Sequence, residues 1–488
     1  MNEKNSTSLF YKRYSVLIIC FILFCLNFIL KSIFIDNRDI ANDEPFTIYW
    51  AQASLSDIFQ ILHNENNPPL HFLLLHFWVK VFGISPMSVR FLSLLFTSLT
   101  SVIIFLIGKN FYNFFTGISA GLIFSFTTTH FFFSHEARVY PLFAMLTALS
   151  LYFFLSIIKE SNQKKYYIFL FISNMLLIYS HYLCFIIPFI ECLSIIIIRE
   201  RNKFIKPFFI LMSCLAISYI PMIFIFIERF SNTASNGTWV PKPEIGQLYG
   251  FLNLFINNRI NMLILIIIFI TGIAVILKQK TFQLVINNVL NQNTIIIFIW
   301  FFIPYILMFL ISFKFPVFID RYILFISVPF YVFIAIITNI LFYKKIYKII
   351  VSTIFIASLI FTLNLNPDNF RRMKELSELI KKIKTNNSYV LIAPGYADLG
   401  FTYHYDLESF KDYKNYKIRL NAQNIYPVYN KTEALKILNI LPEDCIYIQA
   451  GSEFQDPDNK IYNYIVSRYK NVSHYKVYQI YQIHKFYN

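Results

Sequence analysis

Charged residues and glycine are scarce in this sequence of 488 residues. Only 14% of the residues are charged and 11 are glycine, whereas 57% are hydrophobic and the mean hydropathy is +0.54. Soluble domains carry about 25% charged residues, so this composition argues against a soluble protein. It also excludes a glycine-rich, low-complexity chain and predicts an integral membrane protein.

Cysteine patterns and nucleotide-binding motifs are also missing. Five of the six cysteines lie in apolar runs, and Cys445 stands alone in the polar tail, with no CxxC pair that would predict a disulfide framework or a metal site. The net charge of +16 is the kind of signal that nucleic-acid-binding proteins give. In a membrane protein, however, basic residues mark the cytoplasmic side, so we expect no nucleic-acid partner.

The apolar runs predict about eleven transmembrane helices, since about 20 apolar residues cross the hydrocarbon layer. The first run follows Lys12 and Arg13 and has no small-residue cleavage site after it, so we expect an uncleaved signal anchor. The expected spans cover residues 14–35, 87–108, 114–133, 139–158, 166–181, 183–198, 207–229, 260–277, 294–313, 321–340 and 347–365.

The distribution of charge predicts the orientation. With eleven spans, one set of connecting segments is rich in Lys and Arg, and the other carries acids and bases in similar numbers. The positive-inside rule places the basic set in the cytoplasm. We therefore expect a multi-pass protein of the inner (plasma) membrane with a cytoplasmic N-terminus. The odd number of spans places the C-terminal tail outside.

The first outer loop, from Asp36 to about Met87, contains the adjacent acids Asp43 and Glu44 and then the run Asn67-Pro68-Pro69-Leu70. Paired acids on a loop are usually only solvated charges, and a reaction site is the alternative. The apolar run of residues 71–83 is too short to span, so we expect a helix in the membrane interface.

The other outer turns also carry charged or hydrogen-bonding residues. Each has an ordinary explanation: an interfacial ion pair for Glu136 and Arg138, a passive His181, and an Arg321 that only extends to the interface. The functional alternative is phosphate binding, because the planar guanidinium donates several hydrogen bonds and keeps its charge. Within a span, Glu191 is a functional candidate by default, or it pairs with a neighbouring helix.

The order of these motifs resembles a known superfamily. The matching segments are Asp43-Glu44, Asn67-Pro68-Pro69-Leu70 with Trp78 and Phe82-Gly83, Ser88-Val89-Arg90-Phe91-Leu92, His135-Glu136-Ala137-Arg138-Val139-Tyr140 and Asp320-Arg321-Tyr322. In this order they are similar to the bacterial membrane glycosyltransferases of the protein O-mannosyltransferase and lipid A aminoarabinose transferase superfamily (family 39-like). The resemblance covers residues 1 to about 365 and implies the GT-C fold.

The resemblance implies an enzyme that takes a sugar from a polyprenyl-phosphate carrier on the outer face. Asp43 would be the catalytic acid, with Glu44 supporting it, and Arg321 and Arg138 would hold the lipid phosphate. The family's usual residue before Pro-Pro is His or an acid, sometimes associated with a divalent metal; Asn67 is a poorer ligand, although Glu65 lies nearby. The expected substrate-binding residues are Glu136, Arg138, Tyr140, His181, Tyr182, Arg321 and Tyr322.

The chemistry calls for these residue types independently. Displacing a phosphate from an anomeric carbon needs a base for the acceptor's proton and positive groups at the anionic leaving group. One carboxylate and several arginines favour a single displacement with inversion. The acceptor is left open between a protein, a lipid and a glycan hydroxyl. The alternatives are a transporter (flippase) of lipid-linked sugars, which should show broken helices and repeats, and a polysaccharide polymerase or ligase.

From residue 366 the sequence becomes polar. We expect a helix from Asp368 through Lys384, a strand at 388–393, a helix near 431–439, a second strand at 445–451 and a final strand near 475–486. The sequence therefore predicts two domains: a transmembrane domain of residues 1–365 and a small extracytoplasmic α/β domain of residues 366–488.

Overall fold

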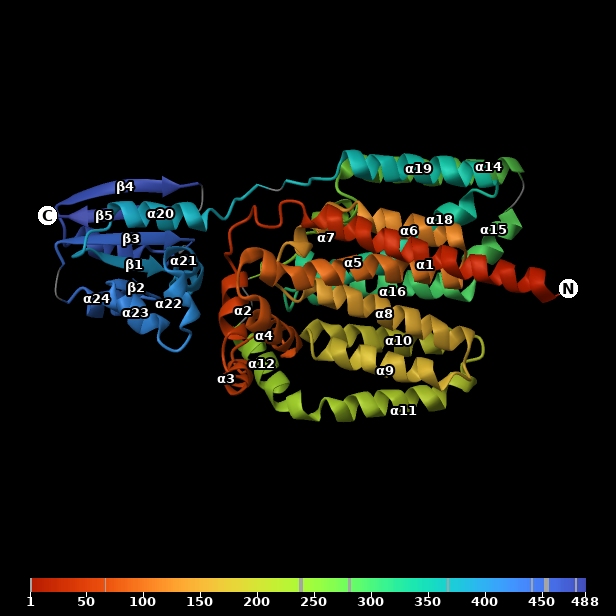
Figure 1. The fold of residues 1–488 in the computed structure, drawn as a ribbon, viewed down its shortest axis with the longest axis horizontal. Helices are drawn as coiled ribbons and strands as arrows, with labels where there is room; N and C mark the ends of the chain where they lie inside the picture. Colours follow the sequence, from red (N-terminus) through yellow and green to blue (C-terminus); the bar gives the residue numbers. More distant parts are fainter. Residues whose placement is uncertain are drawn as a thin grey trace. The chain divides into compact units, whose positions relative to one another are not determined.

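The apolar runs of the sequence form helices, because a helix satisfies its own backbone hydrogen bonds where no water is available. In the computed structural model these helices run side by side over most of the first three-quarters of the chain (Figure 1). The structure describes residues 2–65, 67–236, 240–279, 282–366, 368–439, 442–451, 456–478 and 481–488.

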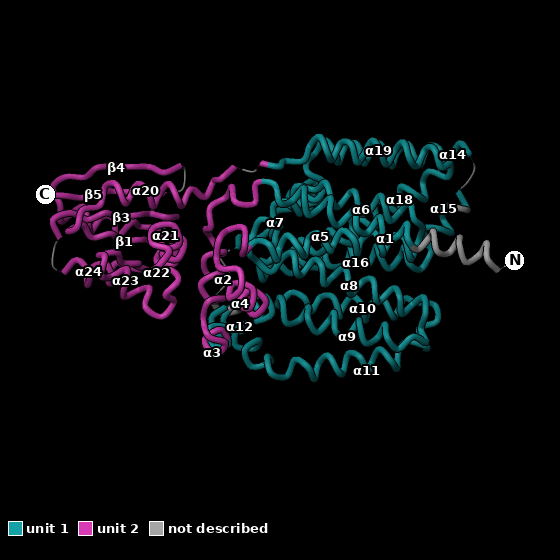
Figure 2. The backbone as a smooth tube through the Cα atoms, viewed as in Figure 1, with its two compact units in different colours: residues 1–33, 59–71, 90–365 teal, residues 34–58, 72–89, 366–488 magenta. Residues whose placement is uncertain are grey.

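The chain forms two compact units (Figure 2). The first unit comprises residues 1–33, 59–71 and 90–365, and the second comprises residues 34–58, 72–89 and 366–488. The second unit therefore groups two segments of the expected first outer loop with the C-terminal segment. The expected division into domains 1–365 and 366–488 remains a prediction.

The first unit contains α-helices with short 3-10 turns between some of them. Three helices carry residues of both units: α3 (Leu55–Ile61), α4 (Leu70–Phe82) and α5 (Pro86–Phe111). The helices of the first unit are α1 (Asn2–Ser32), α6 (Phe114–Ser125), α7 (Thr128–Ser134), α8 (Tyr140–Lys159), α9 (Lys164–Ile178), η1 (Tyr182–Phe185), α10 (Ile186–Ile197), α11 (Asn202–Ser218), η2 (Ile220–Met222), α12 (Ile223–Asn236), α13 (Ile245–Phe255), α14 (Arg259–Gln279), α15 (Phe282–Val289), α16 (Gln292–Ile311), α17 (Asp320–Ile323), η3 (Leu324–Ile326), α18 (Ser327–Leu341) and α19 (Lys345–Phe361).

These helices make the chain a multi-pass membrane protein, but the expected count of about eleven spans is not confirmed. Within the described ranges, six helical segments are long and apolar enough to cross a membrane, or seven if a pair bent by 41° between α11 and α12 counts as one span. Helices also occupy the other expected spans, but α6, α9, α10 and α19 have only 12, 15, 12 and 17 residues. Several apolar runs of the sequence are therefore longer than the helices that form within them.

Small residues let two of these helices approach closely. A Cβ atom added at Gly108 of α5 would lie 2.6 Å from the Cα atom of Gly117 in α6, and one added at Gly117 would lie 2.5 Å from the carbonyl oxygen of Phe105. Small residues at helix contacts are typical of membrane proteins, where packing rather than the hydrophobic effect holds helices together.

Buried polar side chains connect the helices further. Lys31 of α1 donates hydrogen bonds to Asn27 and to the carbonyl oxygen of Ser125 (3.1 Å) at the end of α6. Glu191 of α10 is fully buried and accepts a hydrogen bond from Asn174 of α9 (2.7 Å), while Ser150 of α8 contacts both side chains. Glu191 thus pairs with neighbouring helices, as one of its two interpretations predicted.

The second unit combines helix α2 (Glu44–Ala51) with the C-terminal segment. That segment contains α20 (Met373–Ile383), η4 (Gly395–Ala397), α21 (Asp398–Tyr405), α22 (Leu407–Lys411), α23 (Tyr416–Ala422), α24 (Lys431–Ile437), α25 (Lys460–Val466), and the strands β1 (Tyr389–Ala393), β2 (Ile425–Pro427), β3 (Asp444–Ala450), β4 (Asn471–Val477) and β5 (Tyr481–Tyr487).

The five strands form one mixed sheet in the order β2-β1-β3-β5-β4. β1 pairs in parallel with β2 and β3, and β5 pairs antiparallel with β3 and β4. The strands expected at 388–393 and 445–451 are β1 and β3. The single strand expected near 475–486 is wrong, because two paired strands occupy it. The helix expected from Asp368 begins only at Met373, because Arg372 adopts a left-handed conformation (φ 43°).

Candidate functional site

The two adjacent acids of the first loop lie at the start of α2, in the second unit. Asn42 adopts a positive φ of 58°, which asparagine tolerates better than most residues, and the turn ends at Asp43, the N-cap residue of α2. Pro45 in the first helical turn loses no needed N–H group. Asp43 is half-buried, whereas the Glu44 side chain is only 1% exposed.

Glu44 is held by an arginine from the C-terminal segment. Its Oε2 atom lies 2.6 Å from Nη1 of Arg371, and the Arg371 side chain is only 4% exposed. A buried carboxylate is stabilised by such a charge-assisted hydrogen bond, and removing one partner of a buried pair leaves an uncompensated charge. Arg371 is not predictable from the sequence, because no pattern links residues 327 positions apart.

Further contacts within the second unit connect the loop that carries Asp43 and Glu44, here called the acid loop, to the C-terminal segment. Asp39 accepts hydrogen bonds from the Asn369 amide (3.1 Å) and the Lys374 backbone N–H (2.8 Å). A ring nitrogen of His404 lies 3.0 Å from the carbonyl oxygen of Ile40. A Cβ atom added at Gly400 of α21 would lie 3.5 Å from the Pro45 side chain. The C-terminal segment therefore fixes the backbone on which Asp43 sits.

The other predicted site residues belong to the first unit, and the structure brings five of them together. The rings of Tyr140 and Tyr322 each lie 6.3 Å or less from the His181 ring and 6.3 Å from one another. The Arg138 guanidinium lies 5.9 Å from the Tyr140 ring centre, and the Arg321 guanidinium lies 5.8 Å from that of Tyr322. Two guanidinium groups thus flank a cluster of three aromatic rings.

His181 has a defined protonation state in this cluster. Its Nδ1 atom accepts a hydrogen bond from the Leu183 backbone N–H (3.1 Å), so the proton of the neutral ring sits on Nε2. Burial, together with the positive charges of Arg138 and Arg321, lowers the pKa of His181 to about 3. Nε2 is buried and has no hydrogen-bond partner among the described residues. The ring therefore offers one N–H donor beside two cations.

A second histidine near this cluster was not among the predicted site residues. Burial and the charge of Arg138 lower the pKa of His71 to about 3, which places its ring near the Arg138 guanidinium. The signal was available, because His71 directly follows Pro68-Pro69-Leu70 in the motif. From the sequence, His71 is expected only as part of the helix in the membrane interface.

Two further predicted site residues, Glu136 and Tyr182, make contacts of another kind. Glu136 is buried, and its carbonyl oxygen accepts hydrogen bonds from Ser93 (2.6 Å) and from the Arg138 backbone N–H (2.8 Å), so it shapes the turn that presents Arg138. The Tyr182 ring faces Phe226 at 5.6 Å. No ring contact joins Tyr182 to the cluster among the described residues.

The described residues do not fit a metal centre. They contain no group of three or more His, Cys, Asp or Glu side chains placed to hold an ion. Asn67 donates a hydrogen bond to Glu65 (2.8 Å), which occupies one oxygen of the acid closest to the motif. We derive no catalytic step through a metal.

Comparisons with known proteins define the class. The fold is shared over nearly the whole chain with ArnT of Cupriavidus metallidurans in the apo state (8% identity, 98% of each chain, TM-score 0.60). ArnT bound to undecaprenyl phosphate gives a TM-score of 0.57 (7% identity, 97% of each chain). The oligosaccharyltransferase AglB of Archaeoglobus fulgidus, in complex with an inhibitory peptide and a dolichol-phosphate, also gives 0.57 (10% identity, 97% of this chain and 74% of that one). The chain therefore has a fold like that of ArnT and AglB.

The sequence comparison gives a family match over part of the chain. Residues 66–225 match the family described as dolichyl-phosphate-mannose-protein mannosyltransferase. No curated protein sequence matches the chain significantly. The family match over residues 66–225 and the shared fold both agree with the resemblance to GT-C proteins of the protein mannosyltransferase and ArnT type.

Proposed function

We propose that this protein transfers a sugar from a polyprenyl-phosphate carrier to a hydroxyl group of a protein, lipid or glycan acceptor. The observation that carries the proposal is the cluster of Arg138, Arg321 and the neutral His181 in the first unit. Two permanent cations and a buried N–H donor are the groups that stabilise a phosphate as it leaves. The family match and the ligands of ArnT and AglB support a lipid phosphate as the anion.

The proposed general base is Asp43. Glu44 next to it is buried in the ion pair with Arg371, so Glu44 serves to position the loop rather than to accept a proton. Asp43 accepts the proton of the acceptor hydroxyl while the oxygen of that hydroxyl bonds to the anomeric carbon. The bond from the anomeric carbon to the phosphate oxygen breaks in the same step, and the electron pair leaves with the polyprenyl phosphate.

Tyr140 and Tyr322 complete the proposed donor site. Their rings pack against His181 and against the two guanidinium groups, so they hold the cations in place without neutralising them. Glu136 and Tyr182 take supporting roles in the turns on which Arg138 and His181 lie. A single displacement inverts the anomeric centre; a product that retains the donor's configuration by NMR would overturn this part of the mechanism.

The site is proposed to face the outside of the inner membrane, with the N-terminus in the cytoplasm and the C-terminal segment outside. The predicted cytoplasmic segments carry most of the lysines and arginines of the first 365 residues. A lipid-linked donor also fits a site without access to cytoplasmic nucleotide sugars.

The test is the release of free polyprenyl phosphate by the purified protein in nanodiscs, with a panel of polyprenyl-phosphate sugars and hydroxyl acceptors. Loss of a general base costs roughly 10²–10⁴-fold, so we expect Asp43→Asn to reduce turnover by that factor. Asp36→Asn is the matched control, because Asp36 is an exposed acid of the same loop. Its turnover should equal that of the parent.

Two outcomes would contradict the proposal. Normal turnover by Asp43→Asn, with the variant inserted and folded, would show that Asp43 is not the base. If the parent protein consumes no carrier with any of the acceptors, the transporter alternative is favoured. A liposome flipping assay with the same carriers would then test that alternative.

A further inference from the structure

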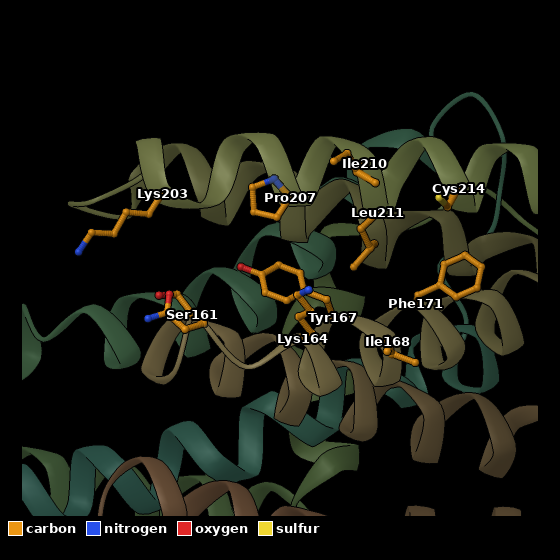
Figure 3. A pocket seen from close by; sticks show the side chains of 11 residues that line it. Ser161, Lys164, Tyr167, Ile168, Phe171, Lys203, Pro207, Ile210, Leu211 and Cys214 are labelled. Carbon is orange, nitrogen blue, oxygen red and sulfur yellow. The ribbon is translucent and has the colours of Figure 1, made fainter.

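A groove that includes two lysines in its lining lies between α9 and α11 of the first unit (Figure 3). Its volume is about 1050 Å³. Ile168 and Phe171 line it from α9, and Pro207, Ile210 and Leu211 line it from α11. The two helices come together beyond the far end, where Ile178 and Leu215 share a buried cluster. The groove is therefore a wedge that is closed at one end by packed apolar side chains.

The open end of the wedge carries the charge. Lys164 begins α9 and Lys203 lies in the first turn of α11, and both line the groove together with Ser161 and Asn162. Figure 3 shows Ser161 and Lys203 at one end and Phe171 and Cys214 at the other. Lys203 also pairs with Glu200 on the surface. Basic residues nevertheless outnumber acids in these two turns: Lys164, Lys165, Arg199, Arg201, Lys203 and Lys206 against Glu160 and Glu200.

The length of the groove matches one leaflet of a membrane. From Lys203 to Cys214, eleven residues of helix rise about 16 Å at about 1.5 Å per residue. Half of the roughly 30 Å hydrocarbon layer is about 15 Å. A lipid whose headgroup lies at the lysines would thus have its chains in the apolar part of the groove. A polyprenyl chain is much longer than one leaflet, so an ordinary phospholipid fits this length better.

We propose that the groove between α9 and α11 binds an anionic glycerophospholipid, with its phosphate at Lys164 and Lys203 and its acyl chains against Ile168, Phe171, Ile210 and Leu211. In the predicted orientation this end faces the cytoplasm, where anionic lipids attract basic segments. This site is separate from the proposed donor cluster, and the inference does not depend on the transferase reaction.

The experiment measures lipid bound to the purified full-length protein by native mass spectrometry, with phosphatidylglycerol and phosphatidylcholine of equal chain length as probes. A lysine placed at an anionic headgroup contributes about 1 kcal/mol to its binding. Lys203 also pairs with Glu200, so its contribution to lipid binding is reduced. We therefore expect Lys164→Gln/Lys203→Gln to weaken phosphatidylglycerol binding by about 10- to 30-fold. The control Lys165→Gln/Lys206→Gln alters two lysines of the same turns that do not line the groove, and its binding should stay within about twofold of the parent.

A second variant tests the apolar part without changing charge. Ile210→Trp fills the groove from an exposed position on α11, so bound phosphatidylglycerol should decrease while the fold is kept. Equal binding of phosphatidylcholine and phosphatidylglycerol by the parent protein would overturn the proposal. Equal losses in the two lysine pairs would also overturn it, as would a preference for polyprenyl phosphate over phosphatidylglycerol at this site.

Discussion

At the level of single residues, the adjacent acids Asp43 and Glu44 occupy different environments. Glu44 is buried against Arg371, and Asp43 is half-buried at the start of α2. The resemblance implies a catalytic role for Asp43 and a supporting role for Glu44, but the sequence does not predict that Glu44 is buried in an ion pair. The difference comes from tertiary packing, since a residue of the C-terminal segment supplies the charge that stabilises one acid and not its neighbour.

We predict that the ion pair between Glu44 and Arg371 positions the acid loop. Removing one partner of a buried pair costs about 3–5 kcal/mol, so Arg371→Gln should lower the unfolding temperature and reduce turnover at least tenfold, mainly through kcat. Glu44→Gln/Arg371→Gln removes both charges and should be more stable than Arg371→Gln alone. Thermal unfolding and donor turnover of the four proteins check this. A double variant less stable than both single variants would contradict the pairing.

Asp398 of the second unit provides a pH-dependent prediction. Burial raises the pKa of this acid to about 6, even though Tyr416 and the Leu399 N–H donate hydrogen bonds to it (2.8 and 2.6 Å). The folded protein therefore holds this proton more tightly than the unfolded chain, so the free energy of unfolding should fall as pH rises from about 4 to 6. A shift of about two pKa units corresponds to roughly 3 kcal/mol.

The measurement compares the unfolding midpoint of the parent with that of Asp398→Asn between pH 4 and 7. The asparagine stays neutral, so the variant should gain stability relative to the parent as pH rises through this window. The difference should be constant above about pH 7. Parallel curves over the whole range would show that Asp398 does not titrate in the folded protein.

At the level of elements, the sequence predicts the helices better than their lengths. Helices occupy every expected span, because apolar runs in a membrane can only become helices. Their ends depend on neighbouring segments: Thr127, for example, lies between α6 and α7, within the single span expected at residues 114–133. In the C-terminal segment, β1 and β3 were predictable from short continuous apolar runs. β2 has only three residues, which is too short to give a recognisable pattern.

The contact between α5 and α6 gives a prediction at this scale. Gly117→Ala places a methyl group 2.5 Å from the Phe105 carbonyl oxygen, so the helices must separate, at a cost of about 1–3 kcal/mol. Gly246→Ala in α13 is the control, because a Cβ atom there meets nothing within 4 Å. Heating in detergent should unfold Gly117→Ala earlier than the parent and Gly246→Ala no earlier. Equal midpoints for Gly117→Ala and the parent would argue against the close contact.

At the level of the whole molecule, the predicted orientation has a direct test. A protease-sensitive tag after Asn488 should be cleaved by protease added to spheroplasts, and a tag before Met1 should be protected, because the basic segments hold their turns in the cytoplasm. The experiment scores both tags in the same spheroplasts. Cleavage of the N-terminal tag, or protection of the C-terminal one, would reverse the assignment of the site to the outer face.

The pairing of Glu44 with Arg371 also has a consequence for the biosynthesis of this protein. The ribosome adds Glu44 to the chain 327 residues before Arg371, and at roughly 5–20 residues per second the interval is about 16–65 s. During that time the acid loop lacks the charge that later fixes it. The loop can reach its final conformation only after the C-terminal segment has been made, so an interrupted chain that inserts its helices correctly would still be inactive.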